Sequence, residues 1–155
     1  MKQFRVLLAD DDEDDRFFFK EGLKESTLPT LLTTVPDGEH LMRLLLNETF
    51  QLPDVLFLDL NMPRKNGFEC LSEIKLNDKL KLLPVVVYST SFDQEVVNQL
   101  YQTGAEYFIR KPALFSHFQA IILQTLDKIV LQSATRPSRD NFVITQQFPE
   151  GTLTS

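Results

Sequence analysis

The chain has a single cysteine, Cys70, among its 155 residues. One cysteine excludes an internal disulfide, and the sequence has no cluster of Cys and His at the spacing of zinc ligands. We therefore expect a protein of a reducing compartment without structural zinc. Cys70 falls within a predicted helix, and we interpret it as a structural residue rather than a reactive one.

Long apolar runs are also missing. No segment approaches the roughly 18 consecutive apolar residues that predict a membrane-spanning helix. The first three residues, Met1, Lys2 and Gln3, lead directly into a predicted strand without the apolar stretch of a signal peptide. We therefore expect a cytoplasmic protein that does not bind a membrane.

Positive charge is in short supply. The chain has 16 Lys and Arg residues against 22 Asp and Glu residues, and its formal net charge is -6. Because a negative protein repels a phosphate backbone, we expect no nucleic-acid partner. The length suits one domain with a sizeable core and leaves no room for a second folded domain.

Short apolar runs that end on polar residues are what the sequence does contain. The run Val55–Leu58 ends on Asp59 and is bounded by Pro53 and Pro63. A run this short suits a strand that is buried on both faces. Its carboxyl end would lie where open parallel α/β sheets bind ligands, although an Asp beside Asn and Pro more often caps a loop or a helix. Asp59 alone leaves both interpretations open.

A second acidic strand end favours a functional role for Asp59 over a capping role. The run Phe4–Ala9 is followed by Asp10 and Asp11, which begin an acidic cluster that extends to Asp15. Two neighbouring parallel strands would bring Asp10, Asp11 and Asp59 into one small pocket, where like charges repel unless a cation joins them. We therefore predict a site for a hard divalent cation.

The rest of the pattern alternates predicted strands with predicted helices. Two further strand runs lead into Ser89 and Lys111. The strands are predicted at 4–9, 31–35, 55–58, 84–88 and 106–110, and the helices at 13–26, 39–48, 66–76, 94–103 and 115–131. This alternation predicts an α/β fold, a doubly wound five-stranded parallel sheet with five helices on its two faces.

Helical spacing predicts which side chains of two helices are buried. Phe17, Phe18 and Phe19 fan across too wide an arc to share one face of the first helix. Phe17 is predicted to be exposed, either as an incidental surface aromatic or as a partner contact. In the last helix, Ile121 is predicted to fall outside the buried stripe, which contains Phe115, Phe118, Ile122, Leu126, Ile129 and Val130.

The acid pair, acid, hydroxyl and lysine at successive strand ends resemble the receiver domains of two-component response regulators. The similarity extends from about Phe4 to Leu131, and five separate motifs keep their spacing. It implies the flavodoxin-like strand order 2-1-3-4-5. The chain is similar to the stand-alone (single-domain) receivers that serve bacterial phytochromes and other sensor histidine kinases.

The resemblance implies a role for each residue at the strand ends. Asp59 is implied to accept a phosphoryl group from a histidine kinase or a phosphotransfer protein, with Lys111 and Ser89 contacting that group. The implied cofactor is Mg²⁺, which takes few carboxylates and keeps several waters. Its implied ligands are Asp11, Asp59, the backbone carbonyl of Asn61 and, largely through water, Asp10.

The other acids and the histidines are given no such role. Asp12, Asp14 and Asp15 are expected to be solvated or to cap the following helix. His40 and His117 stand alone on predicted helices, so the phosphoryl donor is expected to be another protein.

Phe108 occupies the switch position, where receivers often have Tyr. Because Phe lacks a hydroxyl to hold at the surface, we expect it to lie inward before phosphorylation, so that a switch through Ser89 and Phe108 is partly on at rest. Readout is expected on the face of helix 94–103, strand 106–110 and helix 115–131, through a kinase contact or a homodimer.

Residues 133–155 are polar and poor in large apolar residues, and they predict a flexible tail after a receiver domain at 1–132. Phe142–Ile144 and Phe148 are exceptions that could dock on the domain or on a partner. No output domain is predicted.

Two other functions remain open. The chain could be a docking module that works without phosphorylation. It could also be a Mg²⁺-dependent phosphohydrolase, although such enzymes usually carry a second Asp two residues after the nucleophile, where this chain has Asn61. We expect a phosphoprotein of signal transduction rather than an enzyme, catalysing only its own phosphorylation and dephosphorylation.

Overall fold

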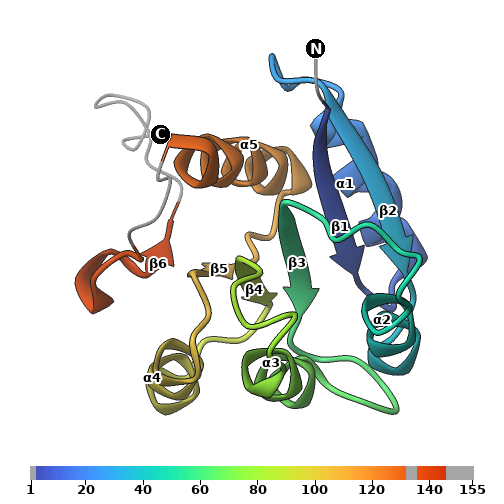
Figure 1. The fold of residues 1–155 in the computed structure, drawn as a ribbon. Coiled ribbons are helices and arrows are strands. Elements are labelled where there is room, and N and C mark those ends of the chain that lie inside the picture. Colours follow the sequence, from blue (N-terminus) through green and yellow to red (C-terminus); the bar gives the residue numbers. More distant parts are fainter. Residues whose placement is uncertain (1–2, 132–135, 146–155) are drawn as a thin grey trace.

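The computed structural model describes residues 3–131 and 136–145. Its strands form one parallel sheet in the order β2-β1-β3-β4-β5-β6 (Figure 1). The predicted α/β class and the order 2-1-3-4-5 are confirmed, and β6 is an addition at the edge beyond β5. The strands are β1 (Phe4–Ala9), β2 (Thr30–Val35), β3 (Val55–Asp59), β4 (Val85–Ser89), β5 (Tyr107–Arg110) and β6 (Val143–Ile144).

The α-helices of the described residues cover both faces of the sheet, α1 and α5 on one and α2, α3 and α4 on the other (Figure 1). None of them is long and apolar enough to cross a membrane. The helices are α1 (Glu13–Leu23), α2 (Gly38–Leu45), α3 (Gly67–Leu76), α4 (Gln94–Thr103) and α5 (Phe115–Leu131), and a 3-10 turn, η1 (Arg139–Asn141), precedes β6.

Polar caps begin the first four helices. The capping side chains accept hydrogen bonds from backbone N–H groups of the first turn, which have no partner within the helix. They are Asp12, Asp37, Asn66 and Asp93. Helix α4 ends at Gly104, whose φ of 117° is left-handed and suits glycine. The predicted bounds of α4 and α5 are confirmed, whereas α1 and α2 end at residues 23 and 45 rather than 26 and 48.

Strand β3 is buried on both faces, as its apolar run predicts. Its first four residues are fully buried, and they alternate between the two cores: Val55 and Phe57 pack with the α1 and α5 side chains, Leu56 and Leu58 with those of α2, α3 and α4. Burial of each such side chain contributes about 1.5–3 kcal/mol. This core holds Asp59, the last residue of the strand, at the carboxyl edge of the sheet.

The structure tests several predictions of burial. Phe17 is exposed, as predicted, and Cys70 is buried, which raises the pKa of its thiol to about 11 and fits a structural role. Ile121 was predicted to be exposed, and this is wrong, because it is 2% exposed. It packs in the same buried cluster as Ile144 of β6, the strand that widens the sheet beneath α5. Val130, predicted to be buried, is 45% exposed.

The prediction of a flexible tail is wrong for residues 136–145, which dock on the domain. Phe142 is fully buried, and its backbone oxygen accepts a hydrogen bond of 3.0 Å from the N–H of Phe108. The Arg136 guanidinium lies 3.9 Å from the ring centroid of Tyr101 and donates to the backbone oxygen of Ala105. The few apolar residues of this segment therefore bury enough area to hold it. Phe148 lies outside the described residues.

Candidate functional site

Three carboxylates meet where β1 and β3 end. The two strands are neighbours in parallel register, with Ala9 opposite Leu58, so the residues that follow them lie side by side. Asp10, Asp11 and Asp59 each offer one oxygen, and these oxygens lie within 4.8 Å of one another. The structure thus brings together the three acids that the sequence singled out.

The pocket is electrostatically unfavourable by itself. Burial raises the pKa of Asp59 to about 8, and the charge of Asp10 adds to the shift. Burial also raises the pKa of Asp10. Close carboxylates of this kind favour protons or a cation, and oxygen ligands of this hardness suit a divalent cation such as Mg²⁺. The donor set therefore fits the predicted metal.

Tyr88 is a member of the site that sequence reasoning missed. Its hydroxyl donates a hydrogen bond to Asp10 Oδ2, while the backbone N–H of Asp12 donates to Asp10 Oδ1 over 2.9 Å. Burial holds the pKa of Tyr88 well above its usual value, so the hydroxyl keeps its proton and acts as a donor. One sequence feature could have predicted this role: Tyr88 is the only aromatic residue in an otherwise aliphatic strand run. A buried Tyr hydroxyl usually has a hydrogen-bond partner.

Asn61 connects Asp59 with Ser89. The N–H of Asn61 donates to Asp59 Oδ1 over 3.1 Å, and its side-chain Nδ2 donates to Ser89 Oγ over 3.0 Å. Ser89 is buried at the end of β4, directly beside β3. The serine hydroxyl is therefore held next to the acid cluster.

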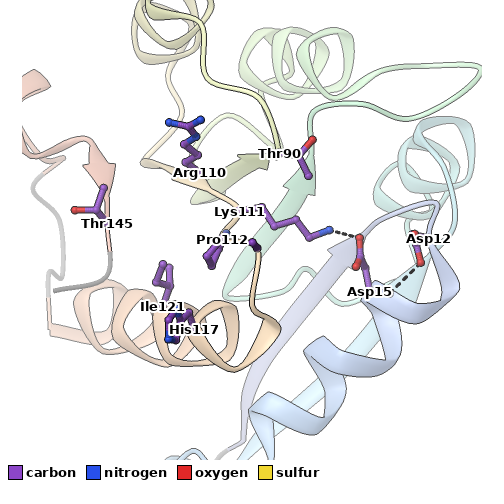
Figure 2. Close-up of a pocket in the computed structure, with 10 residues that line it drawn as sticks. Asp12, Asp15, Thr90, Arg110, Lys111, Pro112, His117, Ile121 and Thr145 are labelled. Atoms are coloured by element: carbon purple, nitrogen blue, oxygen red, sulfur yellow. Dashed lines mark hydrogen bonds and ion pairs between the residues drawn. The ribbon is translucent and has the colours of Figure 1, made fainter. Parts of the chain in front are cut away.

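Lys111 lies at the site but is paired with an unexpected residue. The backbone N–H of Lys111 donates to the backbone oxygen of Ser89 over 2.8 Å, which fixes the backbone just after β5. Its ammonium forms an ion pair with Asp15 of α1 (Figure 2). The expectation that Asp15 is only solvated or capping is therefore wrong, whereas Asp12 does cap α1.

A small hollow of about 310 Å³ lies at this edge of the sheet. Asp15, Asp59, Asn61 and Lys111 line it. A wider hollow of about 830 Å³ adjoins it along the loop between β5 and α5 (Figure 2). Thr90 lines both and was not predicted as a site residue, although it follows Ser89 directly at a strand end.

Phe108 already lies inside the protein. It is fully buried, and its ring centroid is 6.0 Å from that of Phe92 on the loop before α4. Phe108 therefore has the inward position that was expected of it, and its role as a switch stays a prediction. Phe108 also lies directly beside β6, since it is in register with Val143.

Comparison with known sequences identifies the family. The chain matches the response regulator receiver domain over residues 6–123. The response regulator Rcp1 of Synechocystis sp. is 34% identical over 137 residues, which cover 83% of this chain and 93% of Rcp1. The probable C4-dicarboxylate response regulator DctR of Bacillus subtilis is 34% identical over 111 residues. That match covers 72% of this chain but only 47% of DctR.

Solved structures of response regulators are similar to this chain in fold and in sequence. The phosphorylated cyanobacterial phytochrome response regulator RcpA superposes with a TM-score of 0.77 at 34% identity, over 88% of this chain and 100% of RcpA. The Mn²⁺-bound form of response regulator Rcp1 gives 0.75 at 32% identity, over 86% of this chain and 99% of Rcp1. With its sheet order and its acidic strand ends, the chain belongs to the family of response regulator receiver domains, which are signalling proteins.

Proposed function

We propose that the protein is a stand-alone signalling receiver that accepts a phosphoryl group on Asp59. The observation that carries this proposal is the cluster of Asp10, Asp11 and Asp59 at the ends of two adjacent strands. Asn61 and Lys111 line the same hollow as Asp59. The proposed acceptor, the cation ligands and a basic group therefore share one pocket.

The proposed reaction transfers the phosphoryl group from a phosphohistidine of a kinase or phosphotransfer protein. A carboxylate oxygen of Asp59 forms the new P–O bond as the P–N bond breaks, and the released imidazole takes up a proton. Asp59 must be ionised to attack, so positive charge in the pocket has to offset the burial that raises its pKa to about 8.

Other residues of the chain orient and neutralise the incoming group. Lys111 supplies a mobile positive charge for a phosphoryl oxygen. The Ser89 hydroxyl accepts from Asn61 Nδ2 and retains its own proton to donate to the phosphoryl group. Asp10, Asp11, Asp59 and the Asn61 carbonyl would hold Mg²⁺, which when bound supplies the charge that offsets the carboxylates and the phosphoryl oxygens.

A sensor histidine kinase is the proposed phosphoryl source. The likeness to a cyanobacterial phytochrome response regulator, across the whole of that chain, supports it. The proposed setting is the cytoplasm, where such a receiver would signal through protein contacts rather than nucleic acid.

The face formed by α4, β5 and α5 is the proposed surface on which a partner detects phosphorylation. A phosphoryl oxygen on Asp59 would draw the Ser89 hydroxyl, and the loop after β4 would move with it. That loop carries Phe92, which contacts Phe108. A kinase contact or a homodimer could read this shift, although Ile121 is buried and drops out as a contact.

Intact-mass spectrometry with a small acyl phosphate and Mg²⁺ separates the candidate functions. A receiver gains one phosphoryl group, and the Asp59→Asn variant gains none. A docking module that works without phosphorylation would remain unmodified. A phosphohydrolase would release phosphate with rapid turnover and accumulate no adduct.

A further inference from the structure

The ion pair between Lys111 and Asp15 differs from an ordinary surface pair. The two side chains are only 15% and 23% exposed. Pairs between solvated side chains contribute little, because water screens them and ordering two long side chains costs entropy. Here the surrounding protein excludes most of the water, so the Lys111 ammonium favours the ion pair with Asp15 over hydration.

Both partners are held in place from elsewhere. The N–H of Asp15 donates to Asp12 Oδ1 over 3.1 Å, which fixes Asp15 in the first turn of α1. The Lys111 ammonium lies 5.6 Å from the ring centroid of Tyr88 and 5.4 Å from that of Phe118. Aromatic faces attract cations at such distances. The ammonium therefore has a defined position, next to the rings of Tyr88 and Phe118 and with Asp15 as its counterion.

In this position Asp15 competes with the phosphoryl site for the Lys111 ammonium. Asp15, Asp59 and Lys111 line one hollow of about 310 Å³, so both carboxylates border the space that the flexible lysine side chain can enter. Burial raises the pKa of Asp59, and the charge of Lys111 offsets only a small part of that rise, whereas the ion pair of Lys111 is with Asp15.

We propose that Asp15 is a positioning residue that holds the Lys111 ammonium in the unphosphorylated protein and releases it to the phosphoryl group. The inference rests on the proposed function, because it names the regulation of the same site. A phosphoryl group must take Lys111 from Asp15, so Asp15 lowers the stability of the phosphorylated state. Replacing Asp15 with a neutral residue makes Lys111 available and strengthens phosphoryl binding.

The test is the affinity for beryllofluoride, a phosphoryl mimic, measured by fluorine NMR at saturating Mg²⁺. Asp15→Asn is expected to bind it about tenfold more tightly than the parent, the scale of one charge-assisted hydrogen bond. The matched control is Asp12→Asn, which removes the same charge from the same hollow, makes no ion pair with Lys111 and keeps a capping side chain. Its change is expected to be below about twofold.

A double-mutant cycle separates release of Lys111 from a general charge effect. In a Lys111→Ala background, adding Asp15→Asn should leave beryllofluoride affinity within about twofold, since the partner is already missing. A second readout is the ¹³Cε resonance of Lys111 in lysine-labelled protein. It should move on Asp15→Asn without the mimic, and move less on adding the mimic than in the parent. Asp15→Ser repeats the test if Asp15→Asn does not fold.

The outcomes are distinguishable. If the parent fails to bind beryllofluoride, the proposed function fails and this inference fails with it. If the parent binds but Asp15→Asn binds no more tightly than Asp12→Asn, the inference is wrong while the function stands. An equal gain from Asp15→Asn with and without Lys111 would also overturn it.

Discussion

Asp59, the proposed phosphoryl acceptor, lies in an electrostatically unfavourable environment. Its pKa is about 8 in the folded protein and near 3.8 when exposed, so the folded chain binds the proton more tightly between these values. The free energy of unfolding of the metal-free protein should therefore fall as pH rises through this window. Asp59→Asn should remove most of that dependence and, at pH 8, stabilise the metal-free protein by on the order of 1–3 kcal/mol.

Urea unfolding with a chelator at pH 5 and pH 8 measures this effect. Mg²⁺ added at pH 8 should stabilise the parent more than the variant, because the cation binds the folded carboxylates. A parent protein that becomes more stable between pH 5 and pH 8 without metal would show that the acid cluster is not under electrostatic strain.

Tyr88 is expected to support the proposed metal site through Asp10. Tyr88→Phe removes the hydroxyl that donates to Asp10 Oδ2 and leaves a buried carboxylate with one donor fewer. We expect Mg²⁺ affinity to fall by about tenfold or more, as when a group that orients a metal ligand is lost. Isothermal titration calorimetry measures it, with Tyr101→Phe as control, since the Tyr101 hydroxyl donates to Pro137 instead. Equal Mg²⁺ affinity in parent and Tyr88→Phe would contradict this role.

At the scale of elements, the segment 136–145 acts as part of the domain. Phe142 is fully buried against Tyr101, with ring centroids 5.1 Å apart. Phe142→Ala should lower the free energy of unfolding by about 3–5 kcal/mol, the usual cost of emptying a buried phenylalanine site. Phe17→Ala is the matched control, because Phe17 is 55% exposed and its loss should change stability by less than about 0.5 kcal/mol.

Truncation after Leu131 should destabilise the protein at least as much as Phe142→Ala. Urea unfolding compares the two with the parent. A truncated chain as stable as the parent would mean that the segment contributes nothing to the fold in solution.

Much of the fold and the central acids of the site could be predicted from local sequence. Buried parallel strands leave short apolar runs, and helix caps leave polar residues before them, so the alternation of strands and helices and the strand-end residues Asp10, Asp11 and Asp59 were accessible. The sheet order came from the resemblance to receiver domains. The link from Tyr88 to Asp10 spans 78 residues and the one from Lys111 to Asp15 spans 96, and no local pattern encodes them. Strand β6 has two residues, too few for a recognisable run.

At the scale of the whole molecule, the signal is expected to pass from Asp59 through Ser89 to the face of α4, β5 and α5. Self-association and kinase affinity should change when beryllofluoride binds the parent, and Ser89→Ala should lose most of that response. Phe108→Ala should also reduce it, because the ring that contacts Phe92 is missing. Equal responses in all three proteins would move the readout to another surface, with exposed Phe17 as the next candidate.

The central claim is that Asp59 accepts the phosphoryl group. Borohydride reduces an aspartyl phosphate to homoserine, so peptide mass spectrometry after labelling with a small acyl phosphate and Mg²⁺ locates the modified residue. The account predicts homoserine at position 59 alone, dependent on Mg²⁺. Homoserine at another aspartate, or none anywhere in protein that binds Mg²⁺, would contradict it.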